Sequence, residues 1–155
     1  MPKHKATRMD IYERIEKDHD RHRELATKLA ETSGDSQERR DLWRELKGEV
    51  ESHAAAEEQT FYAALIEKPD GQEKARHSIH EHEQASDLIE ELEDDDMSSP
   101  GWIRTFEKLK ESLEHHMDEE EAEVFPLARR LIDDSRASQL AKDFDERKAK
   151  ETQEA

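Results

Sequence analysis

Apolar residues recur along most of this chain at intervals of three or four, the spacing that places them on one face of an α-helix. Four such stripes can be followed, and charged residues fill most positions between them. The stripes comprise Ile11, Ile15, His19, His22, Leu25, Ala26 and Leu29; Leu42, Leu46, Val50, His53, Glu57, Phe61 and Ala64; Ala75, Ile79, His82, Ser86, Ile89 and Leu92; and Phe106, Leu109, Leu113, His116, Glu120, Val124, Leu127 and Leu131. The pattern predicts four amphipathic helices, each with histidine on its apolar face.

Capping residues set the limits of the first two helices. Thr7 followed by Asp10 can begin a helix that runs to about Glu31. Asp35 with Glu38 offers an N-cap and capping-box pair for the second helix. The two helices are therefore joined by a short connection.

The next two helices are separated by residues that favour turns. After a Pro-Asp-Gly break, Asp70 can cap a third helix that begins near Gln72. Ser99 as N-cap and Pro100 as the first helical residue begin the fourth helix. Short connections again imply antiparallel neighbours.

A last apolar pattern follows the fourth helix. Residues from Ala137 to Ala149 predict a short fifth helix that buries Leu140 and Phe144, followed by a polar, frayed tail. We therefore predict an all-α protein with an up-down-up-down four-helix bundle over 8–133. Residues 134–155 form the short C-terminal helix and tail.

The chain also repeats itself after 63 residues. This shift aligns Asp18-His19 with Glu81-His82, Leu25 with Leu88, Leu29 with Leu92, Trp43 with Phe106, Leu46 with Leu109, Val50 with Leu113, His53 with His116, Glu57-Glu58 with Glu120-Glu121, and Tyr62 with Phe125. The repeat predicts two helical hairpins packed with pseudo-two-fold symmetry, and symmetric halves favour two adjacent metal sites.

Composition excludes several classes of function. The net charge of −17 disfavours binding to nucleic acid or anionic lipid, because like charges repel. The chain has no cysteine, which excludes disulfides, thiolate metal sites and cysteine nucleophiles. No apolar segment is long enough for a leader or a membrane span, so we expect a cytoplasmic protein with no membrane partner.

Two glutamates lie on the apolar faces of predicted helices and indicate a cation site. Glu57 and Glu120 each follow a histidine by four residues, so imidazole and carboxylate lie on the same helix face. An unpaired buried carboxylate costs several kcal/mol, and a cation would remove that cost. With His19 and His82 at matching positions of the other helices, the donors suit iron or manganese. We expect iron, with manganese or zinc as the less favoured alternatives.

Single residues at or near these positions also have other interpretations. One His-x-x-x-Glu pair alone is typical of a solvated salt bridge. His22 could be a ligand, a hydrogen-bond donor to a ligand, or a gate to solvent. Glu58 and Glu121 could reach a metal, hydrogen-bond to a ligand or face solvent. Tyr62 could hydrogen-bond near the site, although core packing is the simpler expectation.

Residues outside the site receive structural assignments. We expect Trp43 and Phe106 to pack at one end of the bundle, and Pro126 to kink the fourth helix beyond Glu120. The histidines expected to be exposed are His4, His77, His80 and His115.

The ordered set of these residues resembles one known family, the hemerythrin HHE cation-binding domain. The resemblance runs from about Asp10 to Ile132. It rests on Asp18-His19, His53-x-x-x-Glu57-Glu58 with Phe61-Tyr62, Glu81-His82, and His116-x-x-x-Glu120-Glu121 with Val124-Phe125-Pro126. It implies two iron ions, with an oxo or hydroxo bridge, that bind or react with dioxygen, peroxide or nitric oxide. By position, the implied terminal ligands are His19, His53, His82 and His116, and the implied bridging carboxylates are Glu57 and Glu120.

The chain departs from the family's oxygen carriers in two ways. The carriers have a second histidine four residues from the first in the third helix, where this chain has Ser78 and Ser86 around His82. They also use His-x-x-x-x-Asp in the last helix, where this chain has His116-x-x-x-Glu120. Fewer histidines disfavour reversible oxygen carriage and favour sensing, peroxide removal or iron handling.

Three functional hypotheses follow. The first is a di-iron protein that binds or reacts with a small oxidant, with weak peroxidase, catalase-like or oxidase activity as an open question. The second is iron sequestration or sensing without turnover. The third, a metal-free helical interaction module, leaves Glu57 and Glu120 without partners. The sequence does not identify a redox partner or an oligomeric state.

Overall fold

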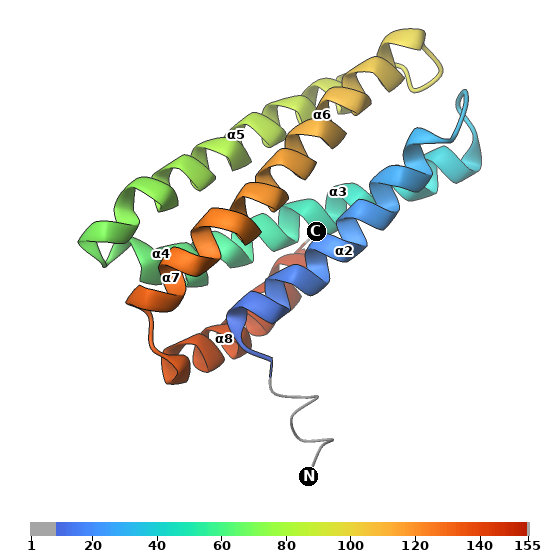
Figure 1. Ribbon diagram of the computed structural model, residues 1–155. Coiled ribbons are helices and arrows are strands. Elements are labelled where there is room, and N and C mark those ends of the chain that lie inside the picture. The colour runs from blue at the N-terminus through green and yellow to red at the C-terminus, as the bar shows by residue number, and fades with distance from the viewer. Residues whose placement is uncertain (1–8, 155) are drawn as a thin grey trace.

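The computed structural model describes residues 9–154, and within that range the chain consists of helices and short connections (Figure 1). The long helices of the bundle are α2 (Ile11–Ala30), α3 (Gln37–Glu57), α5 (Gln72–Asp94) and α6 (Pro100–Glu119). Helix α2 packs against α3, α5 packs against α6, and α2 also contacts α6. The predicted all-α, up-down-up-down bundle is confirmed.

Shorter elements join the two hairpins and end the bundle. They are the π-turn η1 (Glu58–Tyr62), α4 (Ala63–Ile66), the 3-10 turn η2 (Pro69–Gly71), the π-turn η3 (Glu120–Val124) and α7 (Phe125–Leu131). The π-turns follow Glu57 and begin at Glu120, so each half of the bundle has one beside its buried glutamate. An irregularity does lie just beyond Glu120, where Pro126 was expected to kink the helix. Because Ala63 occupies the matching position after η1, proline is not required for it.

The C-terminal helix α8 (Asp134–Glu154) packs against α2 and α3 (Figure 1). It extends beyond the predicted 137–149 at both ends, and residues 150–154 are helical where a frayed tail was expected. Leu140 and Phe144 are buried, as predicted. Lys148 lies 3.0 Å from the Asp18 carboxylate and Arg147 lies 2.5 Å from Glu151, so ion pairs continue the helix where apolar packing ends.

The helix caps differ from the predictions in detail. Asp10 and Glu13 form a reciprocal capping box at α2; Thr7 lies outside the described residues. Helix α3 is capped by Ser36, whose Oγ accepts from the Arg39 amide at 3.1 Å. Asp35 is not the cap, because its carboxylate pairs instead with the exposed side chain of Arg40. The observed N-cap of α3 is therefore one residue later than the predicted one.

The remaining two caps give one correction and one confirmation. Asp70 lies inside the 3-10 turn, and Gly71 precedes α5 without a side-chain cap. Ser99 caps α6 by accepting from the Trp102 amide at 3.2 Å, and Pro100 is the first helical residue. The predicted start of α6 is therefore confirmed.

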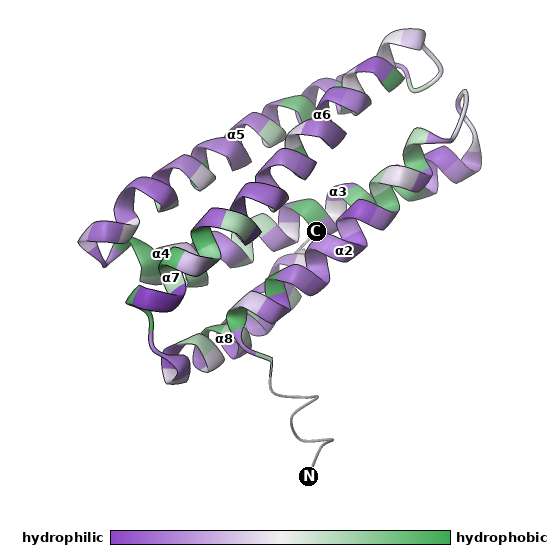
Figure 2. Cartoon of the chain, viewed as in Figure 1, coloured by the Kyte–Doolittle hydropathy of each residue, from purple (hydrophilic) through white to green (hydrophobic). Residues whose placement is uncertain are grey.

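Two apolar clusters occupy opposite ends of the bundle (Figure 2). At one end Trp102 stacks on Phe106 with ring centroids 5.8 Å apart, and Trp43 meets Phe106 edge-on at 6.4 Å, which confirms the expected packing. At the other end Tyr12 contacts Phe61 at 5.9 Å. Each large buried side chain contributes roughly 1.5–3 kcal/mol. The clusters thus hold the helices together on both sides of a polar middle section.

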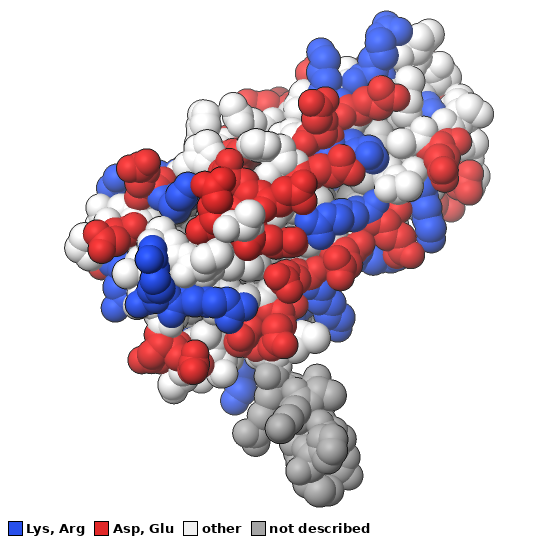
Figure 3. Space-filling model, viewed as in Figure 1, with Lys and Arg blue, Asp and Glu red and all other residues white. Residues whose placement is uncertain are grey.

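The outer surface is strongly charged. Figure 3 shows acidic and basic side chains intermixed over the visible face, with acidic groups more abundant. Pairs such as Arg21–Glu24 and Lys47–Glu51 link successive turns of one helix. Between residues 9 and 154, no helix combines the length and the apolar character needed to cross a bilayer.

Gly71 offers a test of how tightly the two hairpins are joined. A Cβ at Gly71 would lie 2.6 Å from the Leu65 carbonyl oxygen, whereas one at Gly48 would meet nothing within 4 Å. Gly71→Ala should therefore lower the free energy of unfolding by about 1–3 kcal/mol. Gly48→Ala, in the middle of α3, should raise it by about 0.5–1 kcal/mol. Urea unfolding of both variants measures this; a Gly71→Ala protein as stable as the original would contradict it.

Candidate metal centre

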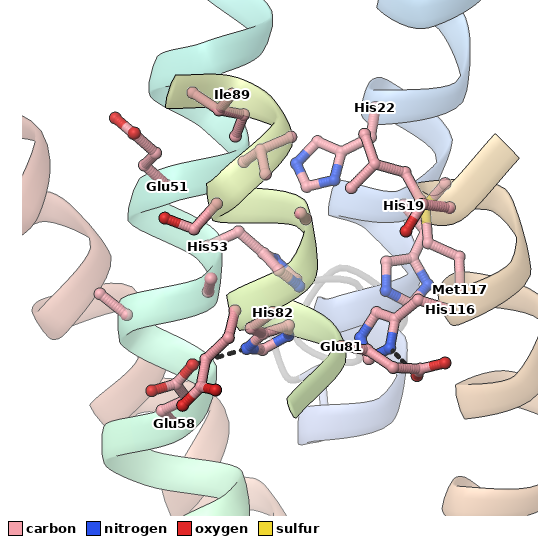
Figure 4. Close-up of a pocket in the computed structure, with 18 residues that line it drawn as sticks. His19, His22, Glu51, His53, Glu58, Glu81, His82, Ile89, His116 and Met117 are labelled. Atoms are coloured by element: carbon pink, nitrogen blue, oxygen red, sulfur yellow. Dashed lines mark hydrogen bonds and ion pairs between the residues drawn. The ribbon is translucent and has the colours of Figure 1, made fainter. Parts of the chain in front are cut away.

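The six side chains predicted as ligands converge between the two apolar ends of the bundle. They are His19 from α2, His53 and Glu57 from α3, His82 from α5, His116 from α6 and Glu120 from η3. Figure 4 shows the rings of His53, His82 and His116 directed toward the space between the helices. The structure thus brings together side chains that are 101 residues apart in the chain.

One group consists of His19, His53, Glu57 and Glu120, whose potential ligand atoms all lie within 4.8 Å of one another. His19 Nε2 is 3.0 Å from Glu120 Oε1, and His53 Nε2 is 3.4 Å from Glu57 Oε2. Both carboxylates therefore approach the imidazoles of the first half of the chain.

A second group consists of Glu57, His82 and His116. His82 Nε2 is 3.0 Å from Glu57 Oε1, and His116 Nε2 is 3.7 Å from Glu120 Oε2. Each glutamate thus lies near histidines from both halves. Two adjacent cations could share the carboxylates between them, as in dinuclear centres with metals roughly 3.5–4 Å apart.

Burial makes this arrangement costly without a cation. Glu57 and Glu120 are at most 1% exposed, and neither Glu57 oxygen has a hydrogen-bond partner. His19 Nε2 and Glu120 Oε1 are 3.0 Å apart, but they are not aligned as a hydrogen bond and both are unpartnered. Unpaired buried carboxylates cost several kcal/mol. Imidazole and carboxylate donors arranged in this way fit a transition-metal ion.

Each of the four histidines is oriented by a further carboxylate at its Nδ1 atom. The pairs are His19 with Glu121 at 2.6 Å, His53 with Asp18 at 2.8 Å, His82 with Glu58 at 2.7 Å and His116 with Glu81 at 2.7 Å. An Nδ1–H that donates outward leaves the Nε2 lone pair directed inward, which is the orientation that metal-bound histidines adopt.

The roles of two of these outer carboxylates were not predicted from the sequence. Hydrogen bonding by Glu58 and Glu121 was among the expectations, whereas Asp18 and Glu81 were only parts of a motif. Each directly precedes a histidine, yet each pairs with a histidine of the neighbouring helix, because adjacent helical residues point about 100° apart. The repeated acid-His dipeptide was the available signal.

Without a cation, protons on the histidines balance the buried charge. Burial alone would lower the pKa of His19, but the close carboxylates of Glu120 and Glu121 outweigh burial and raise the pKa to about 9. At His82 the close carboxylates of Glu57 and Glu58 likewise outweigh burial, and they raise its pKa to about 9. A bound metal would take the place of these protons.

Tyr62 both packs in the core and reaches the centre. Its hydroxyl is fully buried and donates a hydrogen bond to Glu120 Oε2. Burial and the negative charges of Glu120 and Glu57 raise the pKa of Tyr62 well above its usual value. The hydroxyl therefore stays protonated and acts as a donor to the glutamate.

His22 is buried but belongs to neither group of potential ligands. Its Nε2 atom has no hydrogen-bond partner, and its ring meets that of His53 edge-on with centroids 5.1 Å apart. Burial lowers the pKa of His22 well below its usual value, so the ring is neutral. In the second half of the chain, Ala85 occupies the matching position, so the symmetry is broken here.

A cavity of about 410 Å³ adjoins the centre (Figure 4). Its walls combine the imidazoles of His19, His22, His53, His82 and His116 with the apolar side chains of Val50, Ala85, Ile89, Leu113 and Met117. Such a space suits a small, weakly polar molecule.

Comparisons with known proteins agree with this geometry. Residues 10–128 match the family model described as the hemerythrin HHE cation binding domain. A crystal structure of a hemerythrin HHE cation binding domain-containing protein from Mycobacterium kansasii superposes with a TM-score of 0.85 at 26% identity, over 94% of this chain and 89% of that one. A search of curated proteins gave no match.

The raised pKa values predict how the metal-free protein responds to pH. Protonated His19 and His82 stabilise the fold fully below about pH 6.5, the ordinary histidine pKa. This contribution is lost as pH rises through about 9, the pKa in the folded protein. The melting temperature of the metal-free protein should therefore fall between these pH values. A melting temperature that rises over this range would contradict the assignment.

Proposed function

Because the chain belongs to the hemerythrin HHE cation-binding domain family, we propose that it holds two iron ions at which dioxygen, peroxide or nitric oxide binds or reacts. The cavity carries this proposal: it lies against the imidazoles of all four histidines and has room for a small oxidant. In this account iron supplies a redox-active Lewis acid, and the protein supplies the ligands and the access.

The proposed ligands divide into two kinds. His19, His53, His82 and His116 each offer Nε2 from a ring held by an outer carboxylate. Glu57 and Glu120 lie between the two groups of histidines, where each can contact both ions. Carboxylate and imidazole donors suit iron, and manganese and zinc are the alternatives that metal analysis separates.

The third helix leaves room for an external ligand. Ser86 lies one turn after His82, where the family's oxygen carriers can have a second histidine, and it lines the cavity. A small molecule can therefore approach this side of the centre without displacing a protein ligand. This favours reaction with an oxidant over sequestration of iron without turnover.

Two residues of this chain can control protons near the bound molecule. His22 Nε2, buried and unpartnered in the cavity wall, can donate a hydrogen bond to an oxidant or accept one from it. The Tyr62 hydroxyl holds its proton at Glu120 Oε2 and so withdraws charge from that carboxylate. Both groups act by positioning and hydrogen bonding.

Spectroscopy of iron-loaded protein tests the proposal. Protein loaded with Fe²⁺ without oxygen should contain about two iron ions per chain. It should develop visible charge-transfer bands on exposure to air or peroxide, and a distinct spectrum with nitric oxide. Iron that stays bound while ignoring all three reagents would instead support sequestration.

A variant that narrows the cavity sharpens this test. Ala54 lines the cavity and is partly exposed, so Ala54→Phe should obstruct the cavity without disturbing the ligands. The rate of the spectral change should fall about tenfold or more, with iron content unchanged. Ala149→Phe, at an exposed position on α8, is the matched control. Equal rates for both variants would contradict access through this cavity.

A further inference from the structure

A second set of histidines and carboxylates lies outside the centre, between α5 and α6. This outer cluster consists of His77 and Glu81 from α5 and His115 and Glu119 from α6. His77 Nε2 is 2.9 Å from Glu119 Oε1 and 3.4 Å from Glu81 Oε2. His115 Nε2 is 3.3 Å from Glu119 Oε2 and 3.7 Å from Glu81 Oε2. Four potential ligands from two helices thus meet at one place.

Helix geometry explains the convergence. Each helix contributes a histidine followed four residues later by a glutamate, so the two side chains lie on the same face one turn apart. Helices α5 and α6 pack against each other, which brings the two pairs together. Three of these residues, His77, Glu81 and Glu119, place potential ligand atoms within 4.8 Å of one another.

The other half of the bundle has basic side chains at the place that corresponds to the outer cluster. Asp18 is the counterpart of Glu81, and Arg14 is the counterpart of His77. Asp18 Oδ1 is neutralised by Arg14 Nη1 at 2.8 Å and by Lys148 Nζ at 3.0 Å. Among the described residues, no lysine or arginine forms an ion pair with Glu81 or Glu119. His77 therefore stands where the first half has the permanent charge of Arg14, and among the described residues Glu81 has no cation in the place of Lys148.

The glutamates of the outer cluster are also poorly satisfied. Glu81 is 8% exposed; its Oε1 pairs with His116, and its Oε2 is directed at the outer histidines. Glu119 Oε1 is buried and has no hydrogen-bond partner, although His77 Nε2 is 2.9 Å away. The same close but misaligned contact occurs between His19 and Glu120 in the centre. In both places a shared cation would satisfy nitrogen and oxygen together.

We propose that the outer cluster binds a divalent transition-metal cation such as Zn²⁺ or Fe²⁺, with His77, His115, Glu81 and Glu119 as its ligands. Two imidazoles and two carboxylates are donors that these ions prefer, whereas Ca²⁺ and Mg²⁺ prefer oxygen alone. The cation takes the place that Arg14 and Lys148 hold beside Asp18 in the other half.

Glu81 connects this outer site to the centre. Its two oxygens face opposite ways, one toward His116 Nδ1 and the other toward the outer histidines. A substitution at Glu81 would therefore disturb both places, and the test is better made at the two exposed histidines. His77 and His115 are 49% and 67% exposed, so their removal should leave the fold intact.

Zinc binding to the iron-loaded protein tests the proposal. After unbound iron is removed, Zn²⁺ is titrated in competition with a chromophoric chelator, and iron content is measured before and after. The original protein should bind about one further Zn²⁺ per chain. The double variant His77→Ala/His115→Ala should bind this further Zn²⁺ about tenfold or more weakly. His80→Ala is the matched control, since His80 is an exposed histidine of α5 whose nearest carboxylate, Glu83, is 3.8 Å away.

The outcomes are separable from those of the proposed function. Equal zinc binding by the double variant, or no further zinc on the original protein, would overturn the proposal and identify the cluster as ordinary surface ion pairs. If the centre fails to retain iron, the same titration on metal-free protein still compares the double variant with His80→Ala. A zinc equivalent that depends on His77 and His115 supports the outer site in either case.

Discussion

Two carboxylates, Glu57 and Glu120, lie close together in the interior of a highly charged protein. The residues around them offset the cost of burying this negative charge. Four imidazoles surround them, and Tyr62 donates a hydrogen bond to one of them. Burial penalises the charge, so positive charge must be supplied by protons or by metal ions. The geometry fits metal ions because several of the facing nitrogen and oxygen atoms are not aligned as hydrogen bonds.

Apolar packing and the polar centre occupy different parts of the bundle. The aromatic and aliphatic clusters at the two ends supply the hydrophobic stabilisation, so the middle section is free to be polar. Internal symmetry then places one His-x-x-x-Glu pair and one outer acid-His pair in each half. The halves differ where α8 covers one side: Lys148 reaches Asp18, whereas Glu81 is left facing histidines. The candidate ligands are therefore related by the internal symmetry, whereas the charged residues around them are not.

The fold and the inner residues were predictable because helical periodicity reports directly on which face is buried. His53 and Glu57 share a stripe with Leu46 and Val50, and that alone indicates where they point. Roles for Glu58 and Glu121 at the site were anticipated, but the contacts of Asp18 and Glu81 were not, because each contacts a histidine of another helix and no local spacing encodes that contact. The cap at Ser36 and the full length of α8 were missed for a related reason: they depend on tertiary ion pairs and on competition between neighbouring polar residues.

Anomalous diffraction from iron-loaded crystals tests the central claim most directly, because it locates the metal ions that we propose balance the buried carboxylates. Two iron peaks should appear in the middle of the bundle, one near the Nε2 atoms of His19 and His53 and one near those of His82 and His116, with Glu57 and Glu120 beside both. A map without iron there, and with the histidines and glutamates still packed as bare ion pairs, would contradict the account.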